Sequence, residues 1–260
     1  MLLSITFQLF SLEAVDMSIL PISISVQAVR KLFGKSPVLD GVSLNFSSGL
    51  MHGVIGPEGA GKTTLLRLML GLLTATEGTV VYYRGDEQID FESIRPSIAY
   101  MPQTQSLYPD LSIDEHLDFF KELYGIPRDL YDQKREELLR ITRLSEFVDR
   151  PAGQLSGGMY KKLGLMCVLL RSPHVMLLDE PTTGVDPISR REFWELLYRL
   201  LDQEILILVT TAYMDEAERC GRVHLLESGK LVAAGEPREL LAAEGVSSFD
   251  ELFLRRNTHG

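Results

Sequence analysis

The sequence predicts an α/β fold with a parallel sheet, and three observations support this prediction. Short apolar runs typical of buried strands alternate along the chain with amphipathic stretches typical of helices. Residues 56–64 fit the pattern G-x-x-x-x-G-K-[ST], and they lie between a strand-like apolar run and a helix-like apolar run. The composition, with 45% hydrophobic and 24% charged residues, is that of a chain able to bury a sizeable core.

Size and charge narrow the functions that the chain can have. Its 260 residues suit one large domain or two small ones, and its formal net charge of -10 disfavours a fold built to hold duplex nucleic acid. Cys167 and Cys220 fit neither a metal site nor a disulfide framework, as expected in a reducing cytosol. No run of about 18 apolar residues is present, so we do not expect the chain itself to span a membrane.

The first 21 residues form an extension whose status the sequence leaves open. The stretch is apolar but contains Glu13 and Asp16 and no Lys or Arg. A signal peptide requires a positively charged start, so we do not expect one here. The extension is either the product of an upstream start, with Met17 as the working start, or a disordered or docking arm.

The strands are predicted from apolar runs and from alternation of apolar and polar residues. We expect strands at residues 22–29, 39–46, 53–55, 78–83, 98–101, 175–178, 205–209 and 223–226. Because helical patterns separate several of these runs, the core should be a parallel sheet.

The helices are predicted from spacing at three and four residues. One helix should follow the 56–64 motif and end near Gly71. Residues 112–147 show a helical pattern that begins with a capping box formed by Ser112 and Glu115. A further helix after residue 158 should bury one face in the core, and another should cover residues 193–201. We expect short helices in residues 235–254 and a frayed tail at residues 255–260.

The motif at residues 56–64 predicts a binding site for a polyphosphate. Glycines let the backbone approach phosphates because no Cβ stands in the way. Successive N–H groups then form an anion-binding nest at the N-terminus of the following helix. We expect Lys62 to contact the β- and γ-phosphates and the Thr63 hydroxyl to coordinate Mg²⁺. The expected nucleotide-binding residues are Gly56, Pro57, Glu58, Gly59, Ala60, Gly61, Lys62, Thr63 and Thr64.

Two adjacent acids supply the second half of the expected site. Asp179 and Glu180 follow the apolar run 175–178, at the edge of a parallel sheet where ligands bind. We assign Asp179 to Mg²⁺, through water. Successive strand residues point to opposite sides, so Glu180 is the candidate to orient and polarise the attacking water.

Four parts of the chain occur in the order and spacing of ATP-binding cassette (ABC) proteins. They are residues 56–64, Gln103, the run Leu-Ser-Gly-Gly-Met at 155–159, and residues 175–180. From about residue 22 to residue 254, the chain therefore resembles the ATPase subunit of an ABC transporter. Further segments resemble the ATPases of ABC-2-type exporters of drugs and other hydrophobic compounds: residues 100–103, 107–112 and 184–191.

The resemblance implies a fold and a set of partners. The fold is a P-loop NTPase core of the RecA-like type, in which an antiparallel β subdomain accompanies the parallel sheet. An inserted α-helical subdomain is expected at about residues 92–171. The implied partners are a membrane-spanning permease, docked by the helical subdomain at the cytoplasmic face of the membrane, and a second cassette. ATP and Mg²⁺ are the implied cofactors.

The resemblance also assigns roles outside the phosphate loop. Phe33 would stack on adenine, although it could instead be a core residue at the end of a strand. Gln103 would contact Mg²⁺ and the attacking water. Asp186 would cross the interface between two cassettes. The segment that closes over the γ-phosphate of a second cassette would be Ser156, Gly157 and Gly158.

The chain departs from the family pattern at two positions. Met159 replaces a residue that is usually Gln, which we expect to matter little because the preceding serine and glycines make the phosphate contacts. Ala212 stands where the family has a histidine that would bind the γ-phosphate and help to hold the water. We therefore hypothesise that the chain's own site hydrolyses ATP slowly.

The resulting interpretation is an ATPase that drives export through a separate membrane subunit. One alternative is a soluble cassette protein that acts on a ribosome or DNA complex, which the acidic charge disfavours. Another is a nucleotide-binding module without hydrolysis, which Ala212 supports and Glu180 weakens.

Overall fold

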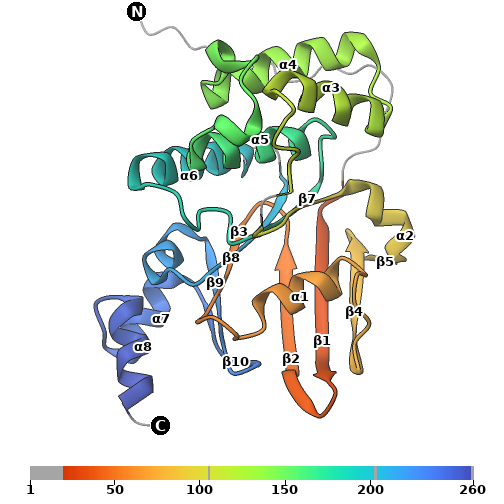
Figure 1. Cartoon of the computed structure of the whole chain (residues 1–260). Coiled ribbons are helices and arrows are strands. Elements are labelled where there is room, and N and C mark those ends of the chain that lie inside the picture. Colours follow the sequence, from red (N-terminus) through yellow and green to blue (C-terminus); the bar gives the residue numbers. More distant parts are fainter. Residues whose placement is uncertain (1–19, 105, 202–203, 259–260) are drawn as a thin grey trace, which may run out of the picture.

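The computed structural model describes residues 20–104, 106–201 and 204–258, which form two β-sheets with helices packed around them (Figure 1). The strands are β1 (Ile22–Phe33), β2 (Ser36–Ser47), β3 (Met51–Ile55), β4 (Glu77–Arg84), β5 (Glu87–Ile89), β6 (Ile98–Met101), β7 (Val175–Asp179), β8 (Leu206–Thr211), β9 (Arg222–Glu227) and β10 (Lys230–Gly235). The α-helices are α1 (Lys62–Met69), α2 (Phe91–Ile94), α3 (Ile113–Tyr124), α4 (Arg128–Thr142), α5 (Gly157–Leu169), α6 (Pro187–Leu201), α7 (Pro237–Glu244) and α8 (Phe249–Thr258).

The larger sheet confirms the predicted parallel core. Its strand order is β10-β9-β3-β8-β7-β6, and all neighbours except β9 and β10 pair in parallel. All five residues of β7 are buried. Val175 and Leu177 pack in the cluster that contains α1, whereas Met176 and Leu178 pack on the side of α6. Because both faces are covered, β7 has a continuous apolar sequence before Asp179.

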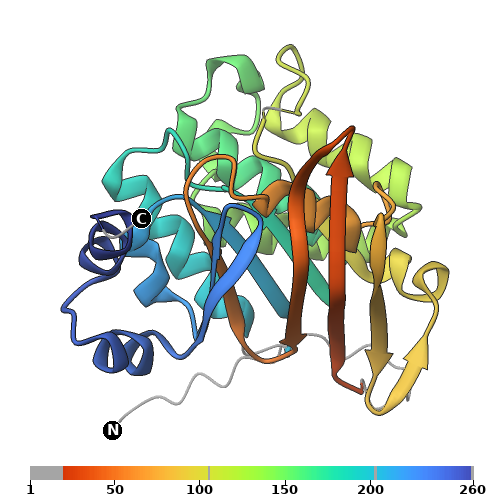
Figure 2. The same cartoon turned by 90° about the horizontal axis from the view of Figure 1, so that it is seen from below.

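The smaller sheet is antiparallel, as the family resemblance implied, with the order β2-β1-β4-β5. Figure 2 shows α1 between the antiparallel strands and the parallel strands. Apolar residues of β1, β2, α1 and the inner face of the parallel sheet share one buried cluster. The helix that carries the phosphate loop is therefore held on both sides.

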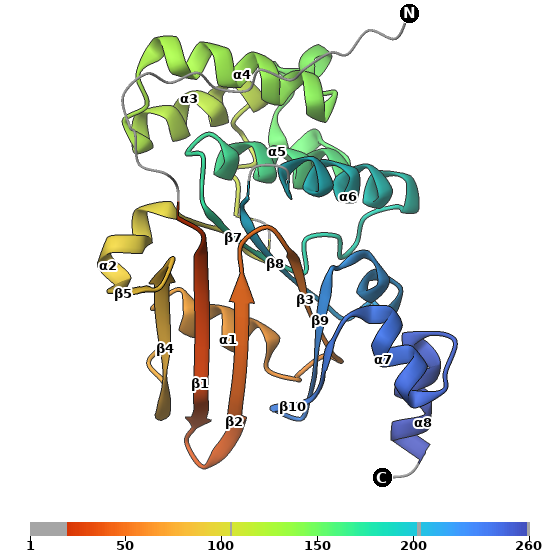
Figure 3. The ribbon, with the colours of Figure 1, turned by 180° about the vertical axis from the view of Figure 1, so that it is seen from behind.

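The helices α3 and α4 lie at one end of the molecule, and α7 and α8 lie at the other (Figures 1 and 3). The Ser112–Glu115 capping box at the start of α3 is confirmed. The expected helical segment at about 92–171 is not wholly helical, because β6 lies within it and pairs with β7 in the core sheet. A separate apolar cluster joins α3, α4 and α5.

The predicted frayed tail at residues 255–260 is wrong for its first four residues, because α8 continues to Thr258. Arg255 forms an ion pair with Glu251, one helical turn earlier, at 2.6 Å. Such pairs stabilise the last turn of a helix. Residues 1–19, which make up most of the predicted N-terminal extension, lie outside the described residues.

No helix in the described part of the chain is both long enough and apolar enough to cross a membrane.

Two buried histidines face each other across β3 and β9. The Nδ1 atom of His52 lies 3.3 Å from Nε2 of His224, and the ring of Phe46 packs against both. Burial lowers the pKa of His52 to about 4 and the pKa of His224 to about 3. Both side chains are therefore neutral in the folded protein at neutral pH.

We expect this pair to make the fold less stable in acid. Unfolded histidines, with a pKa of about 6.5, bind protons before the folded pair does. The contribution of the two neutral histidines to the free energy of unfolding is thus fully present above about pH 6.5. It is lost as the pH falls toward the folded pKa values. Between about pH 7 and pH 5 each histidine should cost about 2 kcal/mol of unfolding free energy. Urea unfolding at both pH values tests this, with His224→Leu as the matched variant. An equally large loss in that variant would contradict the assignment.

Candidate functional site

The phosphate loop connects β3 to α1, and its shape requires glycine at two positions. Gly61 precedes α1 with a φ of 102°, and a Cβ there would lie 2.7 Å from the carbonyl oxygen of Val38. A Cβ on Gly56 would lie 2.1 Å from the carbonyl oxygen of Leu226. Side chains are therefore excluded sterically, which leaves the backbone N–H groups accessible at the start of α1.

Lys62 lies at the base of a cavity formed by this loop. Its side chain is only 4% exposed, and its ammonium donates to the carbonyl oxygens of Gly56 at 2.8 Å and Pro57 at 3.0 Å. The same ammonium lies 3.2 Å from Oε1 of Glu180. The cavity has a volume of about 370 Å³ and is lined by Val38, Glu58, Gly59, Ala60, Gly61, Lys62, Thr63, Thr64, Gln103 and Glu180.

Asp179, at the end of β7, accepts hydrogen bonds from three hydroxyl groups. Its Oδ1 accepts hydrogen bonds from Thr63 at 3.1 Å and Thr210 at 2.7 Å, and its Oδ2 accepts one from Tyr100 at 3.4 Å. Burial and the neighbouring Asp179 charge raise the pKa of Tyr100 to about 12, so this hydroxyl remains a donor. A carboxylate and a threonine hydroxyl in contact form an oxygen donor set that suits Mg²⁺.

Glu180 is held in an unusual backbone conformation. Its φ is 45°, in the left-handed region that residues other than glycine rarely adopt. Its N–H donates to Thr210, and its Oε2 accepts hydrogen bonds from Gln103 Nε2 at 2.8 Å and Thr183 at 3.2 Å. Strained residues of this kind cluster at functional sites because the surroundings fix them there.

The structure therefore brings together the predicted residues Lys62, Thr63, Gln103, Asp179 and Glu180. It places them at the carboxyl edge of the parallel sheet, where ligands bind in open α/β folds.

Sequence reasoning missed four residues around this site. They are Tyr100, Lys161, Thr183 and Thr210. Thr210 was detectable in principle, because it is a polar residue near the end of a buried strand and pairs with Asp179 in register. Lys161 donates to the carbonyl oxygen of Gln103 at 3.2 Å, and burial lowers the pKa of its ammonium.

Other predicted residues do not line the cavity of their own chain. Ser156 and Asp186 cap the first turns of α5 and α6: Ser156 accepts one hydrogen bond from a backbone N–H group and Asp186 accepts two. A Cβ on Gly158 would lie 2.3 Å from Cβ of Ser189, so glycine permits the contact between these helices. Phe33 is 52% exposed, which contradicts the alternative of a core residue, and the ammonium of Lys31 lies 5.2 Å from its ring centroid.

Ala212 directly follows β8 at the same edge of the sheet. Thr211, the last residue of β8, accepts a hydrogen bond from the N–H of Gly56 at 3.2 Å. Ala212, the next residue, therefore lies beside the phosphate loop. Its methyl group cannot form a hydrogen bond to phosphate. The described histidines lie elsewhere, in β3, α3, β9 and the turn before β7.

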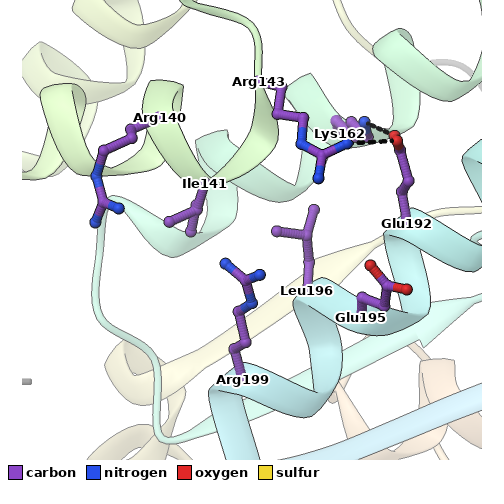
Figure 4. A pocket seen from close by; sticks show the side chains of 8 residues that line it. All are labelled: Arg140, Ile141, Arg143, Lys162, Glu192, Glu195, Leu196 and Arg199. Atoms are coloured by element: carbon purple, nitrogen blue, oxygen red, sulfur yellow. Dashed lines mark hydrogen bonds and ion pairs between the residues drawn. The ribbon is translucent and has the colours of Figure 1, made fainter. Parts of the chain in front are cut away.

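A second hollow is separate from the phosphate loop. Figure 4 shows it between α4, α5 and α6, with the ammonium of Lys162 and the guanidinium of Arg143 directed at Glu192. Lys162 lies 2.5 Å and Arg143 lies 3.0 Å from that carboxylate. The Arg143 pair joins the end of α4 to α6 and the Lys162 pair joins α5 to α6, so we assign both a packing role.

The fold and the site define a phosphate-loop nucleotide-binding protein of the α/β class. Residues 39–183 match the ABC transporter family. The chain belongs to this family, as one of its ATP-binding proteins.

Relatives and solved structures agree with this assignment. The chain is 41% identical over 213 residues to the probable multidrug ABC transporter ATP-binding protein YbhF of Escherichia coli (strain K12), covering 82% of this chain and 37% of that protein. It is 37% identical over 222 residues to the Nod factor export ATP-binding protein I of Ralstonia nicotianae, covering 85% of this chain and 69% of that protein. A solved ATP-binding subunit of an ABC transporter superposes with a TM-score of 0.77 at 29% identity, covering 89% of this chain and 98% of that one. The chain thus spans little more than a third of the length of YbhF.

Proposed function

We propose that the chain is the ATP-binding and ATP-hydrolysing subunit of an exporter, and that it works with a membrane-spanning permease and a second cassette. The observation that carries this proposal is the meeting of Lys62, Glu180 and Gln103 in one cavity, beside the Thr63–Asp179 pair. The E. coli relative is named as a probable multidrug transporter protein and the Ralstonia relative as a Nod factor export protein. These names support a role in export, and we place the chain at the cytoplasmic face of a membrane beside its permease.

The geometry supports separate roles for these residues during hydrolysis. Lys62 and the loop amides bind the β- and γ-phosphates, so the ammonium exchanges its contacts with backbone carbonyls for contacts with phosphate oxygens. Thr63, Asp179 and Gln103 would hold Mg²⁺, which neutralises charge on the phosphates. Glu180 accepts a proton from the attacking water, and Gln103 and Thr183 orient its carboxylate.

The remaining predicted residues act at the edges of this site. Phe33 is exposed and can stack on adenine. Ser156, Gly157, Gly158 and Asp186 lie outside the cavity of their own chain, which fits the proposal that they complete the site of a second cassette. Closing two cassettes over ATP would also exclude water from the reaction.

Fractionation of cells that express the tagged chain tests the assembly. We expect the chain in the membrane fraction together with its permease, and recovery in ribosome fractions would contradict the proposal.

Ala212 favours a second candidate function, that of a module which binds nucleotide without hydrolysing it. Unchanged transport by a complex that carries Glu180→Gln would support that candidate.

Replacing Ala212 by histidine should raise the ATPase rate of the chain by about tenfold. An imidazole directly after β8 would supply the γ-phosphate contact that a methyl group cannot make. Steady-state phosphate release measures this, and Ala212→Leu is the control because it adds bulk without a hydrogen-bond donor. Equal rates for the parent and the histidine variant would contradict the hypothesis of a slow site.

A further inference from the structure

A buried carboxylate connects the loop after β8 to the segment after Glu180. Glu216 lies in the 3-10 helix Met214–Arg219 and is 0% exposed. Its Oε1 accepts hydrogen bonds from Oγ1 of Thr182 at 2.6 Å and from Nε1 of Trp194 at 3.2 Å. Thr182 follows Glu180 by two positions, and Glu216 follows Ala212 by four. The carboxylate therefore joins the segment of the proposed general base to the loop that passes the phosphate site.

Arg190 connects a third segment to the same carboxylate. Its guanidinium donates to the exposed Asp215 at 3.4 Å, and its Nε lies 3.8 Å from Oε1 of Glu216. The guanidinium also lies 4.3 Å from the ring centroid of Tyr213, at cation–π distance. The N–H of Arg190 donates to the carbonyl oxygen of Asp186 at 2.9 Å. Arg190 thus links the turn at Asp186 to the loop after β8.

The contact between Arg190 and Glu216 is incomplete. Among the described residues, Oε2 of Glu216 and Nε of Arg190 have no hydrogen-bond partner, although both atoms are buried. An unpaired buried carboxylate oxygen or guanidinium N–H costs free energy. A small shift of the loop toward α6 would replace the 3.8 Å separation by a hydrogen bond. That shift would give Arg190 Nε the hydrogen-bond partner that it now lacks.

We propose that Glu216 and Arg190 are positioning residues that couple nucleotide binding to the loop after β8 and to the Asp186 turn. This inference rests on the proposed function of ATP binding and hydrolysis. Ala212 offers no hydrogen-bonding side chain to phosphate, so Glu216 supplies a side-chain contact between this loop and the segment that follows Glu180. Closing the Arg190–Glu216 pair moves Thr182 and the Asp186 turn together.

The fluorescence of Trp194 can report a shift of the 3-10 helix that contains Glu216. Trp194 is the only tryptophan of the chain and is fully buried. Its indole N–H donates to Glu216, and its ring lies 5.9 Å from the guanidinium of Arg219, in the same 3-10 helix as Glu216. Tryptophan emission responds to nearby charge, so a shift of this helix changes the emission of Trp194.

The test is a titration of the full-length chain with MgATP, followed by tryptophan emission and, independently, by calorimetry. The parent should change its emission at the midpoint of MgATP binding. Glu216→Gln keeps the volume and one acceptor oxygen but removes the charge that attracts Arg190. This variant should lose the emission change, keep the MgATP Kd within about twofold, and lower kcat about tenfold with little change in KM. Glu218→Gln is the matched control, because it makes the same change at an exposed position of the same 3-10 helix, and it should behave as the parent does.

Two outcomes would overturn the inference: a parental emission response and kcat in Glu216→Gln, or MgATP binding by the parent with no change in emission. If Glu216→Gln fails to fold, Arg190→Gln tests the same link, with the same loss expected and a parental response counting against it. A parent that shows no MgATP binding by calorimetry would instead contradict the proposed function itself.

Discussion

Lys62→Ala should weaken MgATP binding at least about 30-fold. The ammonium is almost fully buried at the base of the cavity, and its contacts there are two carbonyl oxygens and one carboxylate. Removing one member of a buried charge pair costs about 2–5 kcal/mol, and each 1.4 kcal/mol corresponds to about tenfold in affinity. Calorimetric titration with MgATP measures the loss.

Two controls separate binding from folding in this experiment. Lys230→Ala removes an ammonium that is 64% exposed and pairs with Asp40 at the surface, so it should bind MgATP as the parent does. Urea unfolding followed by Trp194 emission should show that Lys62→Ala remains folded. A folded Lys62→Ala protein with parental affinity would rule out the phosphate loop as the nucleotide site.

Glu180→Gln should abolish ATP hydrolysis while leaving MgATP bound. A positioned general base contributes about 10²–10⁴-fold to a rate, and glutamine cannot accept the proton of the attacking water. The hydrogen bonds from Gln103 and Thr183 show that the surroundings orient this carboxylate. The substitution keeps the size of the side chain, so the loss should fall on kcat.

Single-turnover phosphate release from pre-bound ATP measures this effect separately from binding. Glu195→Gln provides a matched control, because its carboxylate pairs with the exposed Arg191 on α6, far in sequence from the phosphate loop. Retention of the parental rate in Glu180→Gln would mean that another group activates the water, or that the chain only binds nucleotide.

The sequence predicted most of the site because its signals are local. Short patterns with one physical interpretation each predicted it: the glycines of residues 56–61, the lysine that follows them, and the apolar run before Asp179. β5 and β10 were not predicted, because their residues are largely polar or small and lack the alternation of a half-buried strand. Fraying was expected at 255–258 because these residues lie near the end of the chain, but α8 continues to Thr258 and contains the Glu251–Arg255 ion pair.

The sequence by itself thus determined the fold class, the phosphate loop and the two acids that follow β7. Only the tertiary structure decided which groups surround them. Thr210 reaches Asp179 across 31 positions and Tyr100 across 79, because parallel pairing places the ends of distant strands at one edge of the sheet. The same is true of the buried contacts of Glu216 and of the His52–His224 pair. Such contacts depend on strand order and burial, which no short stretch of sequence encodes.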